Sequence, residues 1–138
     1  MLIRLLCLLL MIAAAALLPT LALGARLHDA GQIAFHSDAD GDSDVYLLDV
    51  RTRALVNLTR SNPDYDSSPS WSPDGTQMAF ASRRPERGDQ AQLIYLMNID
   101  GSGIERVTQL RSRKPSWSPD GLQIAFTSVA DTIIVADL

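Results

Sequence analysis

The densest run of chemically active side chains in this sequence is acidic. Asp38, Asp40, Asp42 and Asp44 stand at alternate positions, with Gly41 among them. Carboxylate oxygens in a loop that contains glycine are the ligands that calcium prefers in proteins. The EF-hand order is absent, because Gly41 precedes the third aspartate and no glutamate stands at the twelfth position. We therefore interpret residues 38–44 as a charged hairpin loop and keep calcium binding as the alternative, with no residue assigned to a metal or a cofactor.

Side chains that could support catalysis are sparse. His28 and His36 have no recognisable nucleophile partner, and the sequence contains neither a Gly-x-Ser-x-Gly elbow nor a His-Glu-x-x-His motif. Ser102 stands between Gly101 and Gly103, an arrangement typical of a turn rather than of an activated serine. The sequence therefore predicts a protein that is not an enzyme and has no catalytic residue.

The two tryptophans belong to a repeat. The segment Pro-Ser-Trp-Ser-Pro-Asp-Gly occurs twice and places Trp71 and Trp117 46 residues apart. A Gln-x-Ala-Phe pattern follows each copy and occurs once more upstream, so that Phe35, Phe80 and Phe126 hold equivalent positions. Repeats of about 40–50 residues are typical of β-propeller blades. We expect these recurring aromatic side chains to pack between blades rather than to stack on a ligand.

Turn signals divide each repeat into short strands. In Ser-Pro-Asp-Gly, proline presets φ at the second position and aspartate suits the third, while Gly75 and Gly121 take the fourth, where φ can be positive. The strand cores are apolar runs, which are typical of strands covered on both faces. No helix is expected after residue 24. The ten predicted strands span 32–37, 45–49, 54–59, 68–72, 77–82, 93–98, 104–108, 115–118, 123–128 and 132–137.

These motifs resemble the WD40-like repeats of TolB-type β-propellers. The resemblance rests on the Trp-Ser-Pro-Asp-Gly turns, on the strands that follow them and on the acidic hairpin, and it covers about 32–138. It implies an all-β fold, a partial β-propeller built from four-stranded antiparallel blades. The expected parts of blades lie at 31–60, 68–109 and 115–138, within one region of incomplete repeats at 25–138.

The resemblance also carries an expectation about function. Proteins of this type bind partner proteins in the periplasm, which implies a non-catalytic exported module that mediates protein–protein interaction in the cell envelope. The alternative is an accessory propeller of a prolyl-oligopeptidase-like serine peptidase whose catalytic domain is absent from this chain. Loops at 38–44, 61–66 and 83–90 differ in length and charge between repeats and are the predicted partner surface.

Charge argues against a nucleic-acid partner. The net charge is −4, and the basic residues are not clustered into a large patch. Arg111, Arg113 and Lys114 form a small positive group, which we interpret as a solvated loop.

Residues 1–24 are typical of a secretory signal peptide. Arg4 gives a basic start, an uncharged stretch rich in leucine and alanine follows, and small residues precede a cleavage point before Ala25. An uncleaved membrane anchor is the alternative, because about 20 apolar residues can span a bilayer. The only cysteine, Cys7, lies in this stretch, so an exported remainder has no disulfide and depends on a packed core. The predicted location is periplasmic or secreted, or membrane-anchored if the signal stays attached.

The repeats are too few for a closed ring. A propeller typically has 4–8 blades of four strands, whereas this sequence supplies about two and a half at its spacing of 45–46 residues. The first repeat lacks its tryptophan strand, and the last one stops after its third strand. We favour a fragment of a longer protein. Self-association through exposed blade edges and an incomplete stack of sheets remain open.

Overall fold

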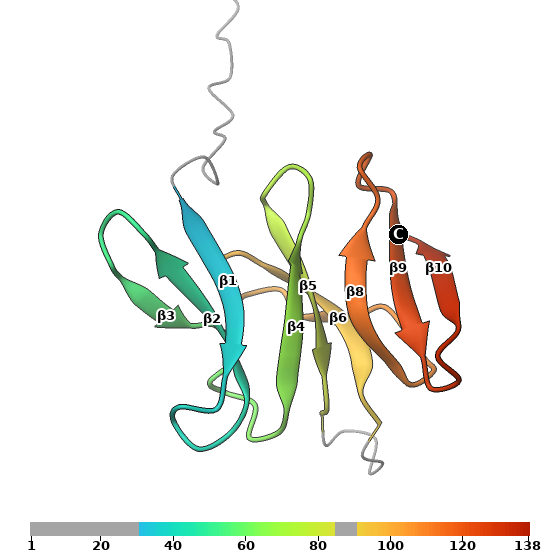
Figure 1. Ribbon diagram of the computed structural model, residues 1–138, viewed down its shortest axis with the longest axis horizontal. Coiled ribbons are helices and arrows are strands. Elements are labelled where there is room, and N and C mark those ends of the chain that lie inside the picture. Colours follow the sequence, from blue (N-terminus) through green and yellow to red (C-terminus); the bar gives the residue numbers. More distant parts are fainter. Residues whose placement is uncertain (1–30, 85–90) are drawn as a thin grey trace, which may run out of the picture.

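The computed structural model describes residues 31–84 and 91–138 (Figure 1). Within these residues the chain forms ten β-strands and no helix, in the all-β arrangement expected from the sequence. The expected signal peptide, with Cys7 and His28, lies outside the described residues. The described part of the chain has no helix that is long and apolar enough to cross a membrane.

Three antiparallel sheets follow one another along the chain. The strands are β1 (Gln32–Ser37), β2 (Asp44–Asp49), β3 (Leu55–Asn57), β4 (Asp66–Trp71), β5 (Gln77–Ser82), β6 (Leu93–Asn98), β7 (Glu105–Arg106), β8 (Ser112–Trp117), β9 (Gln123–Ser128) and β10 (Ile133–Asp137). The first sheet has the order β1-β2-β3, the second β4-β5-β6-β7 and the third β8-β9-β10. Each sheet is a meander, because every strand pairs with its neighbour in sequence.

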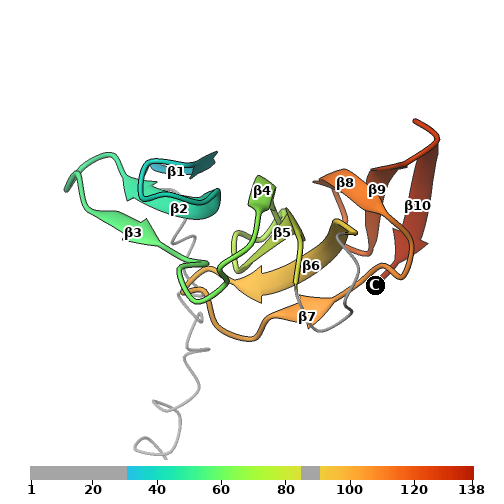
Figure 2. The ribbon, with the colours of Figure 1, turned by 90° about the horizontal axis from the view of Figure 1, so that it is seen from below.

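The sheets stand side by side on a common curve, as consecutive propeller blades do (Figure 2). β4 contacts both β1 and β8, and these three strands lie on the inner side of the curve. β3 and β7 lie on its outer side. The described residues therefore form a partial β-propeller, with one four-stranded blade between two sheets of three strands.

Two apolar cores lie between the sheets. The first joins β2 to one face of β5 and β6, and the second joins the other face of β5 and β6 to β9. Because side chains alternate between the two faces of a strand, the middle sheet is buried on both sides, as its apolar runs predicted. The first core includes Val45, Leu47, Met78, Phe80 and Tyr95, and the second includes Ala79, Ala81, Ile94, Ile124 and Phe126.

The repeated tryptophans pack at these junctions, as predicted. Trp71 contacts the first core and Trp117 contacts the second, and both are half-buried. Trp117 Nε1 also donates a hydrogen bond to the backbone oxygen of Ser70 at 3.1 Å, which joins the third sheet to the second. The indole thus contributes both apolar contact and one polar link between blades.

The Ser-Pro-Asp-Gly segments form the predicted turns. Gly75 N donates to Ser72 O at 2.9 Å, and Gly121 N donates to Ser118 O at 3.0 Å. The two glycines have φ values of 71° and 75°. This left-handed region favours glycine, so the repeated Gly has a local reason to be there.

Two strands begin earlier than the sequence predicted. β4 starts at Asp66 rather than at Ser68, and β8 starts at Ser112 rather than at Pro115. Each strand has a register shift, and within it Ser68 or Lys114 has a φ of 54°. A left-handed residue followed by a proline that cannot donate a hydrogen bond obscures the strand pattern in the sequence.

The interpretation of Arg111, Arg113 and Lys114 as a loop was therefore wrong for two of the three. Arg113 and Lys114 belong to β8, while Arg111 directly precedes it. Their exposure agrees with a solvated surface, but the strand fixes them against the middle sheet. The outer strands β3 and β7 are shorter than expected, with three and two residues.

Candidate functional site

One rim of the stacked sheets carries the loops that the sequence analysis selected (Figure 1). We call it the loop rim and define it by residues 38–43, 61–65, 83–84 and 129–131. These segments follow β1, β3, β5 and β9. Residues 85–90 of the third predicted loop lie outside the described residues. The Ser-Pro-Asp-Gly turns lie at the opposite rim.

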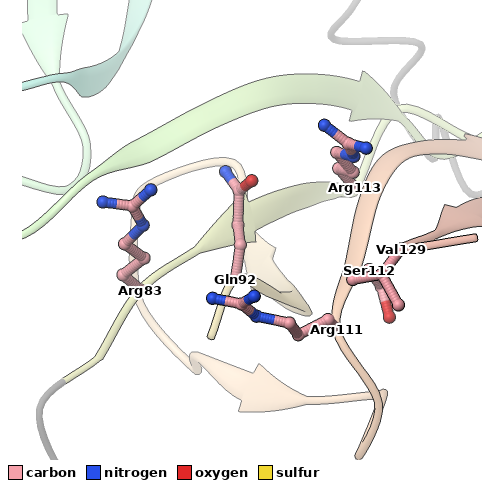
Figure 3. Close-up of a pocket in the computed structure, with 6 residues that line it drawn as sticks. All are labelled: Arg83, Gln92, Arg111, Ser112, Arg113 and Val129. Carbon is pink, nitrogen blue, oxygen red and sulfur yellow. The ribbon is translucent and has the colours of Figure 1, made fainter. Parts of the chain in front are cut away.

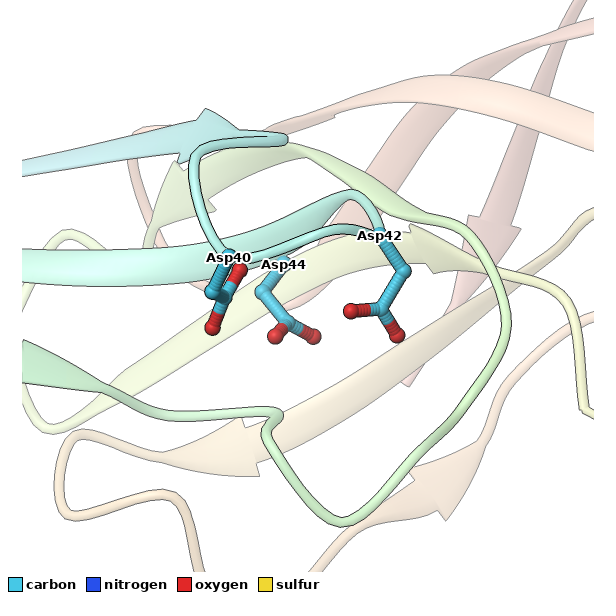
Figure 4. A group of neighbouring side chains, drawn as sticks. All are labelled: Asp40, Asp42 and Asp44. Atoms are coloured by element: carbon cyan, nitrogen blue, oxygen red, sulfur yellow. The ribbon is translucent and has the colours of Figure 1, made fainter.

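The structure brings three of the four aspartates of the acidic run together (Figure 4). One carboxylate oxygen from each of Asp40, Asp42 and Asp44 lies within 4.8 Å of the others. Asp44 is buried, and its oxygens accept hydrogen bonds from Thr59 Oγ1 at 2.9 Å and from Asn57 Nδ2 at 2.6 Å. The cluster therefore ties the start of β2 to the end of β3.

Protein donors also hold the second carboxylate of this cluster. Asn57 Nδ2 donates to Asp40 Oδ2 at 3.0 Å. A hydrogen bond from the Tyr46 hydroxyl lowers the pKa of Asp40. The same hydrogen bond, aided by burial and by the charges of Asp40 and Asp44, raises the pKa of Tyr46 to about 12. A calcium ion would compete with these donors for the same oxygens, and calcium binding stays the untested alternative to a charged hairpin loop.

A separate buried carboxylate, Asp66, links the first two sheets at the rim. Its N–H donates to Ser43 O at 2.6 Å, and Ser43 Oγ donates to Asp66 O at 2.9 Å. Asn62 Nδ2 donates to Asp66 Oδ1 at 3.0 Å, while Asp66 Oδ2 has no hydrogen-bond partner among the described residues. Burial raises the pKa of this carboxyl group and outweighs hydrogen bonds with Ser82 and Asn62 and the charge of Arg84, which act in the opposite direction. No motif in the sequence marked Asp66, because its burial depends on the packing of two sheets.

Two pockets open at the loop rim, one at each junction between sheets. The pocket between the first and second sheets has a volume of about 290 Å³. The pocket between the second and third sheets has a volume of about 230 Å³ (Figure 3). The first is lined by His36, Ser37, Asp38, Ser43 and Tyr65, and the second by Arg83, Gln92, Arg111, Ser112, Arg113 and Val129.

The residues considered for catalysis lie apart. His36 is exposed beside the first pocket, and no hydrogen bond joins it to a serine or threonine within the described residues. Ser102 lies in a turn, where its Oγ donates to Asp100 Oδ1 at 2.6 Å. This geometry matches the turn that the flanking glycines predicted. It gives Ser102 a structural role in the loop between β6 and β7.

Stacked antiparallel meanders with apolar cores between them define a propeller module made of consecutive blades. Comparison with known families gives the same result. A model of the TolB beta propeller domain matches residues 26–137. The chain therefore belongs to the TolB β-propeller family.

Known proteins and solved structures are similar to this chain in sequence or in fold. The Tol-Pal system protein TolB of Francisella tularensis subsp. mediasiatica is 34% identical over 81 residues, which cover 59% of this chain and 18% of that protein. A structure of TolB from Agrobacterium tumefaciens aligns with a TM-score of 0.68 and 25% identity, over 80% of this chain and 43% of that one. The propeller domain of the Trilobed protease from Pyrococcus furiosus aligns with a TM-score of 0.52 and 15% identity, over 77% and 34%. This chain thus spans less than half of each of these proteins.

Proposed function

We propose that this chain is a non-catalytic, exported β-propeller module that binds a partner protein in the periplasm or at the cell envelope. The observation that carries the proposal is that strands stay alike from repeat to repeat while the loops differ. Equivalent strands keep their apolar pattern, whereas the loop after β1 is acidic and the segment after β5 begins with two arginines. Variable loops on a uniform strand frame are typical of grafted recognition.

Sequence similarity supports the proposed location in the cell envelope. The similar protein from Francisella is named as a component of the Tol-Pal system. The predicted signal peptide at 1–24 would deliver the chain to the same side of the inner membrane. Both arguments favour a protein partner of the envelope over a cytoplasmic one.

The accessory-propeller alternative has weaker support. Its structural parallel is the propeller of the Trilobed protease, and an identity of 15% there carries the fold alone.

Fractionation and capture test the proposal. The full chain with a C-terminal tag is expressed in bacterial cells, which are treated with formaldehyde before the periplasmic fraction is isolated. We expect the chain in that fraction, together with one or a few envelope proteins enriched over a tagged periplasmic protein of unrelated fold. Recovery only from the cytoplasm, or no enrichment over this control, would contradict the proposed function.

A further inference from the structure

The two pockets of the loop rim are equivalent in the repeat. Each lies where the end of the strand with the repeated phenylalanine, β1 or β5, meets the start of the first strand of the next sheet, β4 or β8. The repeat spacing aligns Asp38 with Arg83, and Tyr65 with Arg111. An acidic and an aromatic side chain at the first junction are thus replaced by arginines at the second.

Two further aligned positions also make the second junction more positively charged than the first. Ser67 aligns with Arg113, and the buried Asp66 aligns with Ser112, which is only 1% exposed. The first junction supplies its own carboxylate at this position. The second junction has a hydroxyl there instead, which hydrogen-bonds Thr108 and Leu110, and three arginines line the same pocket (Figure 3).

The guanidinium groups of the second pocket are accessible from solvent. Arg83 and Arg111 are exposed, and the side chain of Arg113 is 51% exposed. Arg113 pairs with Asp131 at 3.3 Å, but this aspartate side chain is 83% exposed, so the pair is weak. The Arg83 guanidinium lies over the Tyr65 ring, 5.4 Å from its centroid, which favours one position at the rim.

We propose that this arginine pocket is a carboxylate-binding site that receives an acidic segment of the partner protein, an inference that rests on the proposed function. The planar fork of arginine binds carboxylates through paired hydrogen bonds. The chain as a whole has a net charge of −4 and repels acidic segments elsewhere. A local positive pocket on such a surface determines where an acidic segment docks and in which orientation.

An acidic peptide fits the pocket better than a nucleic acid does. The described residues that line the pocket include no aromatic side chain on which a base could stack, and the Tyr65 ring beside it already contacts the Arg83 guanidinium. Within the described residues the pocket gathers three arginines at one junction, whereas nucleic-acid surfaces follow a longer basic track. The arginines of the pocket are therefore suited to bind one or two carboxylate groups.

Peptide binding tests the inference. A fluorescein-labelled hexaglutamate peptide is titrated with the full chain, and fluorescence anisotropy is followed at about 50 mM and about 300 mM NaCl. We expect saturable binding that weakens at the higher salt concentration, because exposed charges are screened. Absence of saturable binding at the lower salt concentration would overturn the inference.

Matched variants separate the pocket from general charge attraction. The double variant Arg83→Gln/Arg113→Gln should weaken peptide binding by about tenfold or more. The control Arg51→Gln/Arg53→Gln removes the same charge from exposed positions between β2 and β3, which do not line the pocket, and should leave the affinity within about twofold. Equal losses in the two variants would overturn the inference. Thermal melting verifies folding, and Arg83→Lys/Arg113→Lys, which keeps the charge without the fork, should give an intermediate loss.

Two further comparisons decide what the pocket recognises. Inorganic phosphate should displace the peptide only at concentrations far above that of the peptide; displacement at comparable concentrations would show a small-anion site and overturn the peptide assignment. In the capture experiment, equal recovery of a partner by the chain and by Arg83→Gln/Arg113→Gln would leave the proposed function intact and remove this inference. Peptide binding without any captured partner would support the carboxylate-binding site and contradict the proposed function.

Discussion

At the scale of single residues, two buried aspartates beside the loop rim differ in how completely their oxygens are hydrogen-bonded. Asp44 accepts hydrogen bonds on both oxygens, from Thr59 and Asn57. Asp66 receives Asn62 on one oxygen, while the other has no partner among the described residues. A buried carboxylate with incomplete hydrogen bonding favours its neutral form, so its charge is a cost at neutral pH.

Replacement of Asp66 by asparagine should stabilise the fold at neutral pH. The folded-state pKa of Asp66 is raised from its usual 3.8, so its favourable contribution is present below that value and is lost as the pH rises through the folded pKa. We expect Asp66→Asn to raise the free energy of unfolding by about 1 kcal/mol at pH 7. Melting curves from pH 4 to pH 7 should show this gain shrinking toward pH 4.

Asp44→Asn is the matched control for that prediction. Both oxygens of Asp44 serve as acceptors, and an amide nitrogen in place of one of them would face a donor. This variant should lower the melting temperature at pH 7. A lower melting temperature for Asp66→Asn at pH 7 would show that its charge is better compensated than the structure indicates.

Calcium should leave the acidic cluster unchanged. Asn57, Thr59 and Tyr46 already hydrogen-bond Asp40 and Asp44, so an ion gains little by displacing them. We expect millimolar calcium to shift the melting temperature by less than about one degree. A rise of several degrees that disappears in Asp42→Asn would establish the calcium site instead.

At the scale of elements, strand positions could be predicted and junctions could not. The Phe35, Phe80 and Phe126 strands and the Ser-Pro-Asp-Gly turns carry local signals, and the structure has them where expected. The early starts of β4 and β8 depend on bulges with left-handed residues, which leave no periodic pattern. The arginine pocket joins Arg83, which follows β5, to residues at the start of β8, and only the stacking of sheets brings them together.

The Trp117 hydrogen bond gives a prediction at this scale. Trp117→Phe keeps an aromatic ring at the junction but removes the donor to Ser70 O, and we expect a loss of about 1 kcal/mol in the free energy of unfolding. Trp71→Phe is the matched control, because no hydrogen bond of the Trp71 indole is present in the described part of the chain. Urea titration should show a smaller loss for this control; equal losses would assign the effect to ring size alone.

At the scale of the whole molecule, the two outermost sheets leave apolar faces exposed. Ile33 of β1 is 50% exposed, and Ile133 and Val135 of β10 are 74% and 56% exposed. The equivalent positions in the middle sheet, Met78, Ile94 and Leu96, lie within the two cores. The exposed faces are thus of the kind that blades bury against each other. Alignment of the repeats identifies these positions in the sequence.

We therefore expect the isolated chain to self-associate. Light scattering coupled to size-exclusion chromatography should give an average mass that rises with concentration, because exposed apolar faces and strand edges favour pairing. Ile133→Lys/Val135→Thr should reduce this rise, whereas Leu122→Lys at the opposite rim should not. A concentration-independent monomer would contradict the expectation.

The proposed function assigns recognition of a protein partner to the loop rim. Site-specific photo-crosslinking in cells tests it most directly, with a photoreactive residue at Asp38 or Ser61 on the loop rim and at Pro73 or Leu122 on the opposite rim; all four positions are exposed. Both loop-rim positions should form adducts with the same envelope protein, and the opposite rim should not. Adducts only from Pro73 and Leu122, or equal adducts from both rims, would contradict it.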